Sequence, residues 1–206
     1  MTIGKTTKLS AVNTILSIVG EPPISSLSST KNADAILSEQ ILDEVTREVQ
    51  ARGWHFNIVE DVVYSPDSTN TITVSDDVLR IDIEPVNNTS SGSNGKDLLL
   101  RGNKLYDRKN QTYTFTDSVK LTVVTLLPFT DLPETARNYV MIRAGRIFSD
   151  RMVGSEKHHS FTLRDEMQAF ANLRESEMDA NDFTIFDHAH TNRAVNRISV
   201  VDRIGH

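Results

Sequence analysis

The sequence predicts an α+β fold, namely a four-helix bundle with an inserted small antiparallel β-sheet and an extended C-terminal arm. Apolar residues recur at helical spacing towards both ends of the chain, and in the middle they alternate with polar residues. The final residues show no sustained period of either kind. We therefore expect residues 1–56 and 131–180 to form the bundle, residues 57–130 the β insert and residues 181–206 the arm.

The first expected helix carries an apolar stripe formed by Leu9, Val12, Ile15, Leu16 and Val19. Gly20 and the following Pro22-Pro23 pair should end it, because glycine favours the left-handed cap and proline cannot continue a helix. A serine-rich bend then leads into a long second helix, from about Asn32 to Arg52. Two helices joined by such a short loop should pack antiparallel.

The end of the second helix is the most informative stretch of the chain. Its apolar stripe consists of Leu37, Ile41, Val45 and Val49. Gly53 follows where a left-handed cap is expected, and Trp54, the only tryptophan, begins an extended segment. After Trp54 the hydrophobic period changes from helical to two.

Short strands are expected between the two helical regions. One half-buried strand is predicted by the alternation of Leu79, Ile81 and Ile83 with Arg80, Asp82 and Glu84. Gly102-Asn103 lies between Leu98–Arg101 and Lys104–Asp107 and predicts a two-residue hairpin turn. Alternation resumes at Tyr113 and Phe115 and continues through Val119, Leu121 and Val123. We expect a meander of about five or six strands, paired antiparallel because no connection is long enough for a crossover helix.

A third helix is expected from Leu132, with Pro133 tolerated in its first turn and Gly154 at its end. Its inward face should consist of Tyr139, Val140, Ala144, Ile147 and Phe148. A fourth helix should start at Ser155 and run to about Met178. Its inward residues should be Leu163, Met167, Phe170 and Ala171.

Two charged residues fall inside these apolar arcs. At 100° per residue, Arg143 lies between Tyr139 and Ile147, and Glu48 lies between Leu37 and Ile41. In one interpretation the long side chains reach the rim of the bundle and bury only their stems. In the other, Glu48 pairs with Arg143, or with Arg52 one turn on, and sets the register of the helices. Glu48→Ala would then cost about 3–5 kcal/mol by leaving a buried arginine unpaired.

Composition excludes several classes of protein. The chain has 206 residues, no cysteine and a net charge of −6. Cysteine nucleophiles, disulfides and thiolate metal sites are therefore excluded, and clustered positive charge for gripping nucleic acid is missing. With neither a run of about 18 apolar residues nor a signal peptide, we expect no membrane segment and synthesis in a cytoplasm.

No catalytic, metal or cofactor site is expected. Gly4-Lys5-Thr6-Thr7 lacks the upstream strand and glycine of a phosphate-binding loop. His158-His159 and His188-x-His190 are interpreted as surface histidines, since adjacent helical residues point about 100° apart. A glycoside hydrolase needs two acids beside a cleft, and Glu134, Glu156, Asp165 and Glu166 are candidates. This hydrolase stays open as an alternative function.

Several separated segments resemble one family, the tail tubular protein A adaptors of short-tailed bacteriophages. They are Ala11-Val12-Asn13 through Gly20-Glu21-Pro22-Pro23, Arg52-Gly53-Trp54-His55-Phe56-Asn57, Leu105-Tyr106-Asp107, Leu132-Pro133-Glu134-Thr135-Ala136 through Gly154-Ser155, and Asp182 through Ile185-Phe186-Asp187. The sequence departs from the family in the loop from Asn87 to Lys96 and in the link from Asp107 to Thr112.

The resemblance implies a structural virion protein in the phage tail. Such adaptors form a twelve-subunit ring between the portal and the tail nozzle, which tail tubular protein B builds, and the genome passes through the lumen without specific binding. The helical part would face the portal, and the sheet would face the nozzle and possibly the tail fibres. Some relatives have been proposed to degrade envelope polysaccharide, which agrees with the hydrolase alternative.

The resemblance also indicates residues for the partner interface and for the framework. In the arm, Ile185, Phe186 and Asp187 should be the anchors, followed by Arg193, Arg197 and Ile198. Two adjacent apolar residues in a polar tail favour docking into a pocket, and a head-to-tail ring interface would supply one. The framework residues should be Arg52, Gly53 and Trp54, together with Glu48 and Arg143, the two charges that helical pitch places inside apolar arcs.

Overall fold

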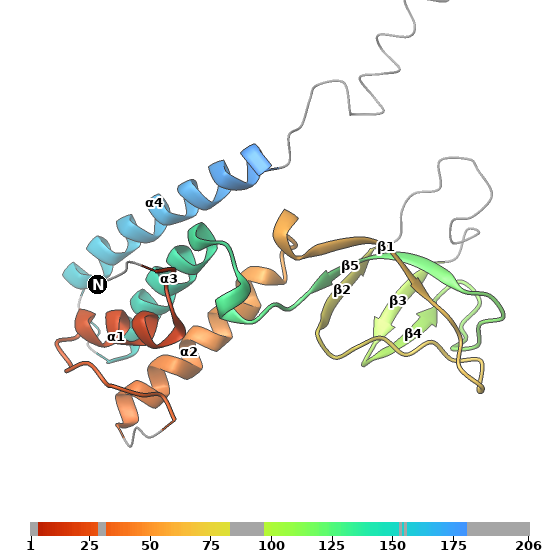
Figure 1. Cartoon of the computed structure of the whole chain (residues 1–206), viewed down its shortest axis with the longest axis horizontal. Coiled ribbons are helices and arrows are strands. Elements are labelled where there is room, and N and C mark those ends of the chain that lie inside the picture. The colour runs from red at the N-terminus through yellow and green to blue at the C-terminus, as the bar shows by residue number, and fades with distance from the viewer. Residues whose placement is uncertain (1–3, 29–31, 83–96, 153, 155, 181–206) are drawn as a thin grey trace, which may run out of the picture.

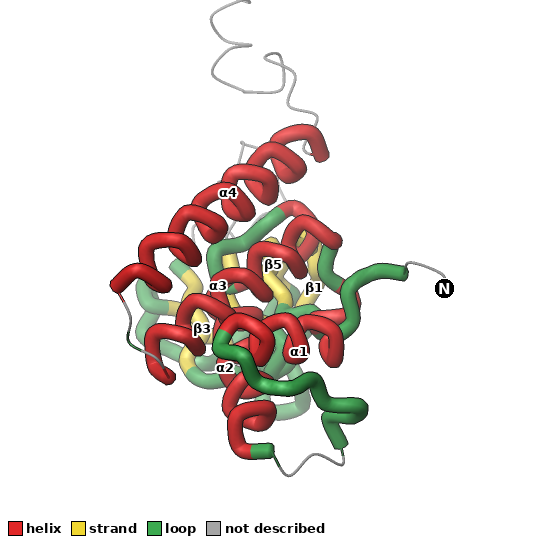
Figure 2. The backbone as a smooth tube through the Cα atoms, turned by 90° about the vertical axis from the view of Figure 1, so that its left-hand side faces the viewer, coloured by secondary structure: helices red, strands yellow, loops and turns green. Residues whose placement is uncertain are grey.

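In the computed structural model, the helices gather at one end of the molecule and the strands at the other (Figure 1). Viewed from the helical end, the helices lie in front of the strands (Figure 2). The α+β class is thereby confirmed. The structure describes residues 4–28, 32–82, 97–152, 154 and 156–180, with the backbone alone for residues 82 and 156–162.

Four helices form close to where the sequence predicts them: α1 Lys8–Ile18, α2 Ala33–Gln50, α3 Glu134–Met152 and α4 Glu156–Ala180. Side chains cap the first two. The Thr7 hydroxyl accepts a hydrogen bond from the Ser10 amide at 3.1 Å, and the Asn32 side chain accepts one from the Asp34 amide at 2.8 Å. These bonds satisfy amides that the first turn of a helix leaves without an internal acceptor.

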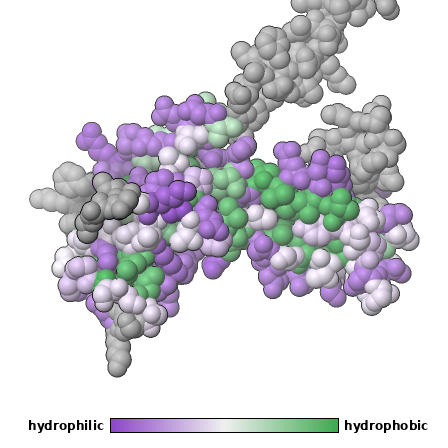
Figure 3. Space-filling model, in the orientation of Figure 1, coloured by the Kyte–Doolittle hydropathy of each residue, from purple (hydrophilic) through white to green (hydrophobic). Residues whose placement is uncertain are grey.

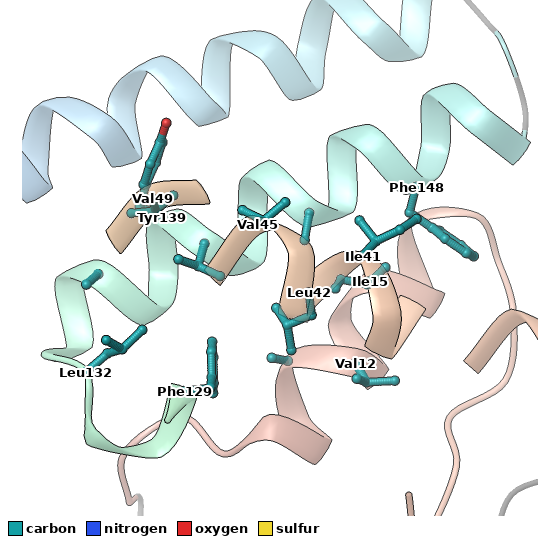
Figure 4. Packing of buried hydrophobic residues seen from close by; sticks show 14 of the residues in the cluster. Val12, Ile15, Ile41, Leu42, Val45, Val49, Phe129, Leu132, Tyr139 and Phe148 are labelled. Carbon is teal, nitrogen blue, oxygen red and sulfur yellow. The ribbon is translucent and has the colours of Figure 1, made fainter. Parts of the chain in front are cut away.

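α3 is the central helix, because α1, α2 and α4 each pack against it. The core between them contains the predicted stripes of α2 and α3, and Figure 4 shows Ile41, Val45, Tyr139 and Phe148 among its members. Tyr139, Val140, Ala144 and Phe148 are all buried, as expected. Closure of all four helices into one bundle stays a prediction.

The inward face of α4 differs from the predicted one. Met167 is 62 % exposed and Ala171 is exposed, whereas Glu166, Ala169 and Leu173 are buried. The predicted inward face of α4 consisted of apolar residues alone. The helix turns instead so that the Glu166 carboxylate meets two arginines of α3, and this brings Ala169 and Leu173 to the inside.

The strands form two small antiparallel sheets instead of one meander. β1 Ile58–Tyr64, β5 Val119–Thr125 and β2 Val78–Asp82 make a three-stranded sheet in the order β1-β5-β2. The last strand in sequence is thus the central one. Its Val119, Leu121 and Val123 are all buried. Alternation in a sequence predicts that such a strand exists, but it does not predict the order of the strands in the sheet.

The second sheet is the predicted hairpin of β3 Leu98–Arg101 and β4 Lys104–Asp107. Gly102 has φ +60°, as the first position of a type II′ turn requires, and Arg101 faces Lys104 across it. The predicted strand at Tyr113 and Phe115 is wrong. Phe115 instead lies buried in a second core between the two sheets, and its amide donates to the carbonyl of Asn70 at 2.8 Å.

Among the described helices, none is both long enough and apolar enough to cross a membrane.

Gly53 is where the helical part turns into the sheet. Its φ of +78° confirms the expected left-handed turn after α2. A Cβ at this position would lie 2.9 Å from a guanidinium nitrogen of Arg80 and 3.2 Å from a methyl group of Val124. The backbone conformation therefore requires glycine, and the methyl group of Val124 on β5 leaves little room for a Cβ, whereas the end of the Arg80 side chain can move.

We expect Gly53→Ala to lower the free energy of unfolding by about 2–4 kcal/mol, because it combines left-handed strain with overpacking. Urea unfolding measures this. Gly20→Ala is the matched control, since Gly20 has φ +85° and open space around it, and its cost should stay near about 1–2 kcal/mol. Equal losses for the two variants would contradict the packing argument.

Candidate functional site

Arg143 links three helices at the rim of the helical core. Its guanidinium lies 2.7 Å from Oε1 of Glu48 on α2 and 2.6 Å from Oε1 of Glu166 on α4. The Glu48–Arg143 ion pair is therefore present. The Glu48 side chain is 51 % exposed, however, so Glu48 lies at the rim and does not face the core as expected. The buried acid is Glu166, whose side chain is 9 % exposed.

Glu166 is held by two arginines. Besides Arg143, the Nε of Arg146 donates to Oε2 of Glu166, and Arg146 also pairs with Asp150 at 3.0 Å. Burial acts to lower the pKa of Arg143, but hydrogen bonds to Glu166 and Glu48 outweigh it and raise this pKa. The hydrogen bond to Glu166 likewise raises the pKa of Arg146. Both arginines therefore stay charged and fasten α4 to α3.

An aromatic cluster lies where α4 passes the end of α2. Trp54 stacks on Phe56 with ring centroids 6.4 Å apart and meets the edge of Phe170 at 6.3 Å. The guanidinium of Arg52 lies over the Phe170 ring at 5.6 Å, so Arg52 contacts this ring in place of the alternative Glu48 pairing. The Trp54 indole donates to the Val49 carbonyl at 2.7 Å. The cluster joins α4 to the start of the sheet.

Two buried amides, those of Gln50 and Asn57, join the helical part to the sheet. The Asn57 side chain donates to the carbonyls of Gln50 (3.0 Å) and Thr125 (2.9 Å), and it accepts from the Trp54 amide (2.8 Å). The Gln50 side chain makes a paired hydrogen bond with the backbone of Leu127, at 2.9 and 2.8 Å. Sequence analysis missed both residues, although Asn57 ends the Arg52–Asn57 segment and Gln50 directly follows the apolar stripe of α2.

Arg137 is a buried arginine that sequence analysis missed. It is 4 % exposed, and its guanidinium donates to the carbonyls of Leu132 (2.8 Å), Thr6 (2.7 Å) and Thr130. Glu134 accepts hydrogen bonds from the hydroxyl and amide of Thr6, and these lower its pKa. The two side chains thus attach the N-terminal segment to the start of α3.

The four acids considered for hydrolysis do not form a catalytic pair among the described side chains. Glu134 binds Thr6, and Glu166 lies between two arginines. Asp165 lines a groove of about 390 Å³ between α1, α3 and α4, and the side chain of Glu156 lies outside the described residues. Within the described part of the chain, no cluster of three acids or histidines could hold a metal ion.

A cleft of about 700 Å³ opens at the corner between α4 and β1. We call it the corner cleft, and its lining consists of Gly53, Trp54, His55, Ile58, Val59, Glu60 and Glu177. The Glu177 carboxylate accepts a hydrogen bond from the His55 amide at 2.7 Å, so the end of α4 lies beside the start of β1. The predicted arm anchors, from Ile185 to Ile198, lie outside the described residues.

Comparison with known proteins connects this architecture to phage tails. Residues 9–183 match the sequence model of a protein family described as Tail tubular protein. The chain is also similar to Tail tubular protein A of Klebsiella phage KP34, with 29 % identity over 169 residues. That alignment covers 82 % of this chain and 86 % of the relative, so both the helical part and the sheets are included.

Glu166→Ala should lower the free energy of unfolding by about 3–5 kcal/mol, because it leaves two partly buried arginines without their shared acid. Glu48→Ala should cost less than about 1 kcal/mol, since Glu48 is half exposed and Arg143 keeps Glu166. This revises the larger loss expected from the sequence. Urea unfolding of both variants tests whether Glu166→Ala loses more stability than Glu48→Ala. A larger loss for Glu48→Ala would contradict the central role of Glu166.

Asn57→Asp should cost about 3 kcal/mol, because a carboxylate cannot donate to the carbonyls of Gln50 and Thr125 and would lie buried against them. Thermal or urea unfolding measures the loss. Asn103→Asp, at an exposed residue of the β3–β4 turn, is the control for the same chemical change. If the two variants unfold alike, the Asn57 amide does not hold the junction.

Proposed function

Because the chain belongs to the tail tubular protein family, whose members are structural components of the virion tail and not enzymes, we propose that it is the adaptor between portal and tail nozzle. The observation that supports this proposal is the family match itself, which runs from α1 to the end of α4. Family membership also favours the structural role over the hydrolase alternative, since the family is a structural virion component.

In this proposal, copies of the chain form a closed ring of twelve subunits with a lumen for the ejected DNA. A ring of identical subunits requires two different complementary surfaces on each copy, joined head to tail. The helical core and the β core of the chain could each provide one of these surfaces, and the Gln50 and Asn57 amides join the two cores. A net charge of −6 suits a channel that DNA must pass without being held.

We assign the parts of the chain as follows. The helical bundle of residues 1–56 and 131–180 faces the portal, and the β insert of residues 57–130 faces the nozzle protein and the tail fibres. The arm of residues 181–206 extends the interface between subunits or with the portal. Its proposed anchors are Ile185, Phe186, Asp187, Arg193, Arg197 and Ile198.

Mixing the purified chain with the portal ring of the same phage should give one complex of fixed mass by light scattering. Electron microscopy of that complex should show a ring of this chain coaxial with the portal. The chain mixed with an unrelated portal is the control. A chain that stays monomeric beside its own portal would contradict the adaptor proposal.

A further inference from the structure

The outer edge of β1 is one of the open edges of the described sheets. β1 pairs with β5 on one side, and no described strand pairs with it on the other. Its Val59 and Val63 are 46 % and 62 % exposed, and Figure 3 shows hydrophobic surface over this part of the molecule. Open edges with exposed apolar residues are sites where a further strand can add. A bulge between Val59 and Val62 limits the regular edge next to the helices to Ile58–Glu60.

This short edge borders the corner cleft, whose lining contains both apolar and acidic residues. Ile58, Val59 and Trp54 supply the apolar lining, and Glu60 and Glu177 supply the carboxylates. An extended segment that fits here needs β-branched residues for the apolar lining and positive charge for the carboxylates.

One segment of the chain has this composition. Residues 197–204 read Arg-Ile-Ser-Val-Val-Asp-Arg-Ile, with Ile198 and Val200 on one side of an extended strand and without glycine or proline. Arg197 and Arg203 supply the complementary charges. We propose that residues 197–204 of a neighbouring copy add as a strand along Ile58–Glu60 and fill the corner cleft. This inference rests on the ring proposed above.

The length of the chain favours a neighbouring copy over the same one. α4 ends at Ala180, close to the start of β1 of its own chain, as the hydrogen bond from His55 to Glu177 shows. A strand on its own edge would need only the first few residues of the arm. Arg197 lies about 17 residues further on, a reach of up to about 55 Å when extended, which is enough to cross to a second subunit.

Cross-linking tests the contact directly, because the chain has no cysteine. We expect the Val59→Cys variant, mixed with the Ile198→Cys variant under assembly conditions, to give a bismaleimide-linked dimer that contains one copy of each. Asp76→Cys, in the turn before β2, replaces Val59→Cys in the control pair. A dimer yield no higher than in this control overturns the proposal. A chain carrying both Val59→Cys and Ile198→Cys that gives only internally linked monomer also overturns it, by placing the arm on its own edge.

Charge exchange tests the recognition. Glu60→Arg alone and Arg197→Glu alone should each lower the fraction of assembled ring measured by light scattering, and the two changes together should restore it. Asp76→Arg, the same change of charge away from the cleft, should leave assembly as in the wild type. Failure of the double variant to recover over either single variant overturns the proposed contact.

The two proposals fail in different ways. A wild-type chain that forms no ring with or without the portal contradicts the adaptor function itself. If the wild-type chain forms the ring, the cysteine variants give no Val59–Ile198 cross-link, and the ring forms equally well without residues 193–206, then the adaptor function stands and only the β1 docking site is overturned.

Discussion

The junction between the helices and the sheets is the constraint on which the rest of the structure depends. Among the described residues, the chain crosses between the helical core and the β core at two places, after α2 and before α3. The Asn57 amide bridges these crossings by donating to Gln50 on one and Thr125 on the other. The Gln50 side chain adds two bonds to Leu127. Because these groups are buried, their hydrogen bonds must all be made at once, and that holds one relative orientation of the two cores.

α4 extends this junction towards the C-terminus. It is attached through charge at one point, where Arg143 and Arg146 hold Glu166, and through aromatic packing at another, where Phe170 meets Trp54 and Tyr139. Its end is further attached by Glu177 to the His55 amide. The place where the arm leaves the described structure is therefore fixed relative to the corner cleft. In the ring proposed above, such a fixed origin would set which neighbouring surface an arm of given length can reach.

Sequence reasoning succeeded for features that depend on residues close together in the chain. The ends of the helices follow from local capping and glycine chemistry, as at Asn32 and Gly53. The β3–β4 hairpin follows from Gly102-Asn103 alone. The framework pair Glu48 and Arg143 could be recognised because charges within an apolar arc are conspicuous at helical pitch. The contribution of this pair to stability could not be predicted, because it depends on a third partner, Glu166. The rotation of the helix that carries Glu166 does not follow from the sequence.

The amino-acid sequence by itself determined the α+β class, the four helices, the hairpin and the membership of the tail tubular protein family. These follow from periodicity, turn chemistry and segments that can be compared residue by residue. Only the tertiary structure decided the central place of β5, the inward turn of Glu166 and the joining roles of Gln50, Asn57 and Arg137. The physical reason is that strand order and buried polar bonds connect residues far apart in the chain, and their partners become definite only when the whole chain packs.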